Sequence, residues 1–159
     1  MALRVLFLRC LQLLTSSYLK YNMGRIIALD YGKKRTGIAV TDPLKLIATG
    51  LTTVDTQTLF DFLKKYVATE IVEKIIIGEP FNLDGTETDS TAAVQHCIRR
   101  LKNSFPSIPI ETVDERFTSK MASKAMVEMG MKKKDRQKKG MIDEVAATMM
   151  LQEYLESKM

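Results

Sequence analysis

The apolar runs in residues 25–54 limit the fold of this chain more than any other feature. Three strand-like segments follow one another there: RIIALDY (25–31), TGIAVTD (36–42) and IATGLTTV (47–54). Only short turns join them, and parallel neighbours would need a longer crossover. The three segments should therefore form an antiparallel meander.

After the meander, predicted helices alternate with predicted strands. In chain order these elements are a helix over 57–69 with Thr56 as its cap, a strand over 74–79, a helix over 88–104, a strand over 108–114, and helices over 119–129 and 140–156. Strands that are joined through helices run parallel to their neighbours. The order predicts an α/β fold: a five-stranded mixed sheet, an antiparallel meander followed by parallel strands, with helices on both faces.

The first 22 residues are apolar but are interrupted by Arg9, so they hold no uninterrupted membrane-spanning run. Met23 directly precedes the first predicted strand. We expect residues 1–22 to be an extension outside the domain and residues 23–159 to form a single domain. We expect no membrane partner, because residues 1–22 hold no spanning run. The two cysteines form no CxxC pair, which favours a reducing, cytoplasmic setting without a zinc site.

The net charge of +5 is unevenly distributed along the chain. The segment KKKDRQKK (132–139) carries six basic residues and one acidic residue. A basic run is often only a solvated loop, but beside a site built for phosphates it indicates contact with nucleic acid. The candidate contacts in this run are Lys132, Lys133, Lys134, Arg136, Lys138 and Lys139.

Carboxylates occur at the ends of several predicted elements. The set comprises Asp30, Glu79, Asp114, Glu115 and Asp143. Binding sites in open α/β sheets form beyond the carboxyl ends of the strands. Asp143 lies near the start of the last helix and is followed by Ala146 and Ala147, whose small size would let that helix approach the sheet and bring Asp143 toward Asp30.

Several carboxylates at one edge repel one another unless a cation neutralises them. Mg²⁺ is suited to such a place, because it takes oxygen ligands from one or two carboxylates, water and phosphates. Two ions about 4 Å apart would support phosphodiester hydrolysis. The alternatives for single residues are that Asp30 caps a turn, that Asp143 offsets a helix dipole, and that Glu115 pairs with Arg116.

Four motifs give the chain a family resemblance. They are DYGKKRTGIAV (30–40), IIIGEPFNLDGT (75–86), VDERFTS (113–119) and KKGMIDEVAATMMLQEYL (138–155). In order and spacing they resemble the YqgF family of small RNase H-like nucleases, over residues 24–157. That family resembles Holliday-junction resolvases and is regarded as processing the 5′ end of pre-16S rRNA.

The resemblance implies an RNase H-like fold and assigns roles to individual residues. Asp30, Glu115 and Asp143 match its acidic positions and would bind Mg²⁺ or Mn²⁺ as the catalytic residues. Arg35 and Arg116 match its basic positions and, with the neighbouring Lys33 and Lys34, are expected to contact phosphate. The implied partners are precursor rRNA or branched DNA, together with precursor ribosomal particles, for a monomer or a homodimer.

Glu79 departs from the family pattern, which usually has an apolar residue there. Junction resolvases of the RuvC type place a catalytic Glu near the end of the equivalent strand. Glu79 is therefore a secondary candidate, either as a fourth ligand or as an outward-pointing substitution.

Three other functions fit parts of the sequence. A junction resolvase would cut two strands symmetrically and should be a two-fold dimer. A non-catalytic nucleic-acid-binding module would not need Asp30, Glu115 and Asp143 together. An actin-like kinase also opens with an Asp-x-Gly hairpin, but it needs a second lobe for which this chain is too short.

Overall fold

The structure, a computed structural model, describes residues 24–79, 91–114, 126–127, 130 and 139–158. Its strands are β1 (Arg25–Tyr31), β2 (Arg35–Thr41), β3 (Ala48–Asp55), β4 (Val72–Glu79) and β5 (Ile110–Asp114). Its helices are the short 3₁₀ turn η1 (Thr56–Thr58), α2 (Leu59–Thr69), α3 (Thr91–Ser104) and α6 (Lys139–Glu156). The helix expected over 119–129 lies outside the described residues, apart from Met126 and Val127.

The five strands form one mixed sheet in the order β3-β2-β1-β4-β5. β1 pairs antiparallel with β2, and β2 pairs antiparallel with β3. β4 is parallel to β1, and β5 is parallel to β4. The predicted meander followed by parallel strands is confirmed.

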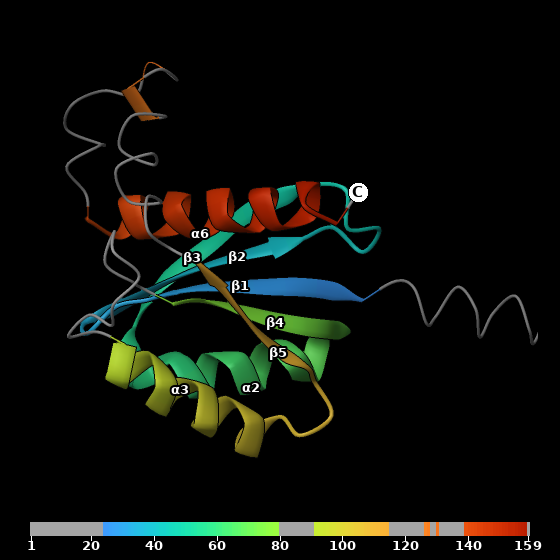
Figure 1. The fold of residues 1–159 in the computed structure, drawn as a ribbon, viewed down its shortest axis with the longest axis vertical. Helices are drawn as coiled ribbons and strands as arrows, with labels where there is room; N and C mark the ends of the chain where they lie inside the picture. Colours follow the sequence, from blue (N-terminus) through green and yellow to red (C-terminus); the bar gives the residue numbers. More distant parts are fainter. Residues whose placement is uncertain (1–23, 80–90, 115–125, 128–129, 131–138, 159) are drawn as a thin grey trace, which may run out of the picture.

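Helices cover both faces of the sheet, with α2 and α3 on one face and α6 on the other (Figure 1). Successive strand residues point to opposite faces, so alternate residues share a face. In β1, Ile27 and Leu29 pack into the core under α2 and α3, whereas Ile26 and Ala28 pack under α6. This alternation decides below which side of the sheet each candidate residue lies on.

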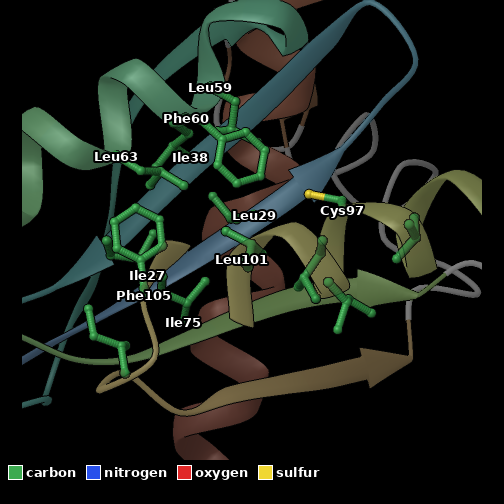
Figure 2. Close-up of a cluster of buried hydrophobic side chains, with 14 of the residues drawn as sticks. Ile27, Leu29, Ile38, Leu59, Phe60, Leu63, Ile75, Cys97, Leu101 and Phe105 are labelled. Carbon is green, nitrogen blue, oxygen red and sulfur yellow. The ribbon is translucent and has the colours of Figure 1, made fainter. Parts of the chain in front are cut away.

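The larger core lies between the sheet and the pair α2 and α3 (Figure 2). Leu63 and Leu101, from the two helices, are fully buried against Leu29 and Ile75 of the strands. Burying each such side chain contributes about 1.5–3 kcal/mol. This core fixes β1 and β4 side by side at the centre of the sheet.

A polar cluster joins the second half of α6 to β4 and β5. The carboxylate of Glu111 accepts hydrogen bonds from Lys74 Nζ and from the Tyr154 hydroxyl, each at 2.8 Å. Lys74 Nζ also donates to the Tyr154 hydroxyl at 2.8 Å. The hydrogen bonds from the Lys74 ammonium and the Tyr154 hydroxyl lower the pKa of Glu111 to about 2. The cluster fastens the C-terminal part of α6 at the end of the sheet opposite to Asp30.

Thr56 does not have the predicted capping role. Neither η1 nor α2 begins with a side-chain cap. The Thr56 hydroxyl instead donates to the Gly32 carbonyl at 2.7 Å and lies 3.0 Å from the Thr36 hydroxyl, while its backbone N–H donates to the Lys34 carbonyl. The prediction was wrong because the side chain is used for a long-range contact that holds the β1–β2 turn.

None of the helices in the described part of the chain is long and apolar enough to span a membrane.

Candidate active site

Two glycines let α6 lie directly on the sheet. A Cβ atom on Gly37 of β2 would lie only 2.0 Å from the carbonyl oxygen of Asp143, so no other residue fits there without displacing the helix. A Cβ atom on Gly50 of β3 would meet the Glu144 carboxylate at 2.5 Å. Ala146 and Ala147 of α6 are buried, as their small size predicted. The start of α6 is therefore fixed in height above β2.

This contact brings Asp143 to the strand position beside Asp30. Asp30 is the register partner of Gly37, and residues directly opposite in an antiparallel pair point to the same face. Asp30 also shares its face with Ile26 and Ala28, which pack under α6. Both carboxylates therefore belong to the α6 face, at the end of the sheet where β1 ends and α6 begins (left in Figure 1).

Arg35 joins this pair of carboxylates from β2. Its Nε donates to Asp143 Oδ2 at 3.0 Å, and the side chains of Arg35 and Asp143 are 36% and 26% exposed. Arg35 lies two residues before Gly37 and so shares its face of the sheet. The residue expected to contact phosphate thus has a carboxylate of the site as its partner.

Glu79 lies on the other side of the sheet. It shares its face of β4 with Ile75 and Ile77, which are in the core under α2 and α3, and its carboxylate accepts a hydrogen bond from Gln95 Nε2 of α3. The structure therefore does not bring Glu79 together with Asp30 and Asp143. The role of Glu79 as a fourth ligand stays a prediction, and its partner among the described residues is Gln95 of α3.

Tyr31 and Cys97 also lie on the α3 side. Burial raises the pKa of the Tyr31 phenol, and it raises the pKa of the Cys97 thiol to about 12. A thiol with that pKa stays protonated near neutral pH and is a poor nucleophile. Neither side chain is therefore suited to act as a nucleophile near neutral pH.

The donor set suits a hard divalent cation. Asp30 and Asp143 supply carboxylate oxygens from one face, and one or two carboxylates are the usual protein contribution to Mg²⁺. Among the described ranges, no three His, Cys, Asp or Glu side chains gather closely enough to hold a metal ion. The third expected ligand, Glu115, lies outside those ranges, immediately after the last residue of β5.

Lys33 and Lys34 occupy the turn that follows Asp30. Both are exposed, and together with Asp55, Gln57 and Thr58 they line a hollow of about 340 Å³. The hollow lies between the β1–β2 turn and the start of η1 and α2. The two lysines therefore place positive charge in the turn that directly follows β1.

One of the remaining predicted contacts belongs to a described element. Lys139 is the first residue of α6, four residues before Asp143. The others lie outside the described residues: Arg116, Lys132, Lys133, Lys134, Arg136 and Lys138.

Sequence reasoning missed Gly37, Gly50 and the second role of Arg35. A glycine inside a strand often marks close approach of another backbone, so Gly37 and Gly50 carried a usable signal. No sequence signal pointed to the Arg35–Asp143 pair, because the two residues are far apart in the sequence and only the packing of α6 on the sheet brings them together.

Comparison with known proteins identifies the family. The family model described as "RuvX: Holliday junction resolvase" matches residues 24–157. A protein of Phocaeicola vulgatus named "Putative pre-16S rRNA nuclease" is 54% identical over 86% of this chain and 98% of its own length. The Flavobacterium johnsoniae protein of the same name is 53% identical over 86% of this chain and 99% of its own length.

Among solved structures, RuvC of T. thermophilus, in complex with a Holliday junction substrate, aligns with 85% of this chain and 95% of its own. The identity is 15% and the TM-score is 0.49, which leaves the fold to be judged from the sheet. The strand order, with its antiparallel and parallel halves, is that of the RNase H-like fold that the resemblance implied. With a family model that matches nearly the whole described domain and relatives above half identity, the chain belongs to the RuvX family, also called YqgF.

Proposed function

We propose that this chain is a metal-dependent endonuclease that processes the 5′ end of pre-16S rRNA in ribosome biogenesis. The observation that carries the proposal is the contact of Asp143 with Gly37, the register partner of Asp30. It sets two carboxylates from distant parts of the chain on one face at one end of the sheet. Metal-dependent phosphodiester hydrolysis uses such carboxylates, because they hold the cations that neutralise the phosphate.

Asp30, Asp143 and Glu115 would hold Mg²⁺ or Mn²⁺. A cation held there would polarise the scissile phosphate and activate water for hydrolysis. The backbone of this chain contributes rigidity: Asp30 is in a central strand, and Asp143 rests on β2 through its own carbonyl. Fixed ligands spare the site the cost of ordering them when substrate arrives.

The cations around the site would hold the nucleic acid backbone. Lys33 and Lys34 lie on the turn after Asp30, and Arg116 follows Glu115 in the sequence. The basic run 132–139 ends where α6 begins. Such contacts to phosphate fix the position of a nucleic acid without reading its sequence. Together they would place the scissile phosphate at the carboxylates.

The names of the relatives favour precursor rRNA as the substrate, because both of those cited are named for pre-16S rRNA. This role implies a cytoplasmic protein that acts on precursor ribosomal particles. The family description favours a second candidate, the resolution of four-way DNA junctions. One experiment can compare both substrates.

The test is a cleavage assay with wild-type protein and the Asp30→Asn variant. Each is incubated with a pre-16S rRNA fragment and with a four-way DNA junction, in Mg²⁺, in Mn²⁺ and in EDTA. We expect metal-dependent cleavage of the RNA by the wild type and a loss of at least about 100-fold in Asp30→Asn, since removing one ligand charge disables the site. Asp61→Asn, the same change at an exposed position of α2, should cleave like the wild type.

The outcomes separate the candidates. Cleavage of the junction with no cleavage of the RNA would replace the proposal by junction resolution. Binding of either substrate without cleavage in any metal would leave only a non-catalytic binding module. Cleavage by Asp30→Asn at the wild-type rate would remove the carboxylate edge from the chemistry.

A further inference from the structure

The Arg35–Asp143 ion pair joins the start of β2 to the first turns of α6. The bond runs from Nε to Oδ2 at 3.0 Å, and both side chains are about one third exposed or less. A guanidinium donates in fixed directions, unlike the freely rotating ammonium of a lysine. The pair therefore restricts the orientation of the Asp143 carboxylate and also balances its negative charge.

Both partners are attached to backbone that is itself fixed. Arg35 begins β2, where it pairs in register with Asp55 of β3, and its carbonyl accepts the Gly32 N–H at 3.0 Å across the turn. Thr56 holds the same turn through the carbonyls of Gly32 and Lys34. Asp143 rests on Gly37. Because the backbone of both Arg35 and Asp143 is held in place, the fold sets the geometry of the ion pair.

We propose that Arg35 is a positioning residue for the candidate metal site: its Nε–H holds one oxygen of Asp143 so that the other oxygen is presented to the cation. This inference rests on the proposed function. Ligating carboxylates are commonly held by hydrogen bonds from a second residue, and loss of that residue costs about 10- to 100-fold in metal affinity or activity.

A rival explanation makes Arg35 only a counter-charge for Asp143. In that case the side chain competes with the cation, and any change that weakens the ion pair should leave metal binding unchanged or tighter. Arg35→Lys separates the two explanations, because it keeps the positive charge and removes the guanidinium.

The experiment is calorimetric titration of Mn²⁺ into the full chain, with no nucleic acid present. We expect Arg35→Lys to bind Mn²⁺ about 10-fold more weakly than the wild type. The matched control is Arg25→Lys, which makes the same change in the Arg25–Glu70 ion pair, 2.8 Å long, at the start of β1. That variant should bind Mn²⁺ like the wild type.

Two further measurements exclude a purely structural effect. The melting temperature of Arg35→Lys should lie within about 3 °C of the wild type, as expected for a partly exposed ion pair. In an Asp143→Asn background, Arg35→Lys should change Mn²⁺ affinity by less than about twofold, because a residue that acts through Asp143 has no separate effect without it.

Equal or tighter Mn²⁺ binding by Arg35→Lys would overturn the inference and leave the counter-charge explanation. A wild-type protein that takes up no Mn²⁺ would overturn it as well. The proposed nuclease function is judged separately: a protein that binds Mn²⁺ in an Arg35-dependent way but cleaves no nucleic acid would keep the inference and lose the nuclease.

Discussion

At the scale of single residues, Gly37 determines whether the two carboxylates can meet. It lies in the middle of a strand, where glycine is normally unfavourable because it has no side chain to pack. Here the missing side chain is the reason for its presence, since the Asp143 carbonyl occupies that space. Gly37, which takes no part in the chemistry, thus fixes the position of Asp143, which is proposed to bind the metal ion.

Gly37→Ala should therefore both destabilise the protein and impair the site. The added Cβ would meet the backbone of α6, which cannot move aside as a flexible side chain would. Overpacking of this kind typically costs 1–3 kcal/mol, and we expect about 2–3 kcal/mol in the free energy of unfolding measured with urea. The affinity for Mn²⁺ should fall too, because α6 would have to move away from the sheet and would carry Asp143 away from Asp30.

The matched control for this substitution is Gly140→Ala, on α6 itself. A Cβ there would lie 3.6 Å from the Thr53 side chain, an ordinary van der Waals distance. Since alanine is the better helix former by up to about 1 kcal/mol, this variant should equal the wild type or be slightly more stable. If Gly37→Ala were as stable as the wild type, the close approach of α6 would not hold in solution.

At the scale of elements, the strands were easier to predict than the face that each residue occupies. The strand runs and the antiparallel-then-parallel order followed from hydrophobic pattern and spacing, and the first strand was predicted with its observed bounds, Arg25–Tyr31. The face of Glu79 could not be predicted, because β4 is buried on both sides and its pattern does not alternate. The predicted capping role of Thr56 was wrong for another reason, because its hydroxyl donates to the distant Gly32 carbonyl instead.

α6 is fastened at both ends by different means, and one of them depends on pH. Near Asp143 it is held by backbone contact with the sheet, whereas its second half is held through Glu111, Lys74 and Tyr154. The hydrogen bonds from Lys74 and Tyr154 lower the pKa of Glu111 from 4.5 to about 2. The ionised carboxylate is thus favoured by folding.

This shift predicts the direction of a pH effect on stability. A carboxyl group whose pKa is lower in the folded state stabilises that state fully above its unfolded pKa, near 4.5, and loses the effect as the pH falls toward 2. Because the Glu111 side chain is 38% exposed, solvent screening reduces its contribution to about 1 kcal/mol near neutral pH. Urea unfolding at pH 7 and pH 3 should show the gap between wild type and Glu111→Gln narrowing at pH 3.

Glu153→Gln, at an exposed position of α6, is the control for that comparison and should follow the wild type at both pH values. A gap between wild type and Glu111→Gln that stays constant, or widens as the pH falls, would mean that the ionised Glu111 does not fasten the helix.

At the scale of the whole molecule, the two ends of the sheet carry different chemistry. The end where β1 stops carries Asp30, Asp143, Arg35 and the lysines of the turn, and the opposite end carries the cluster around Glu111. The family match begins at residue 24, as does the described structure. We propose that residues 23–159 form the domain. All of the candidate site residues lie within it.

The central claim is that Asp30 and Asp143 form one metal site, and a crystal structure of the protein grown with Mn²⁺ tests it most directly. Anomalous scattering would locate the ion independently of the protein atoms. We predict a peak at about 2.0–2.5 Å from a carboxylate oxygen of each residue, the range for oxygen ligands of hard cations. A peak that contacts only one of them, or that lies elsewhere while this edge holds no ion, would contradict the account.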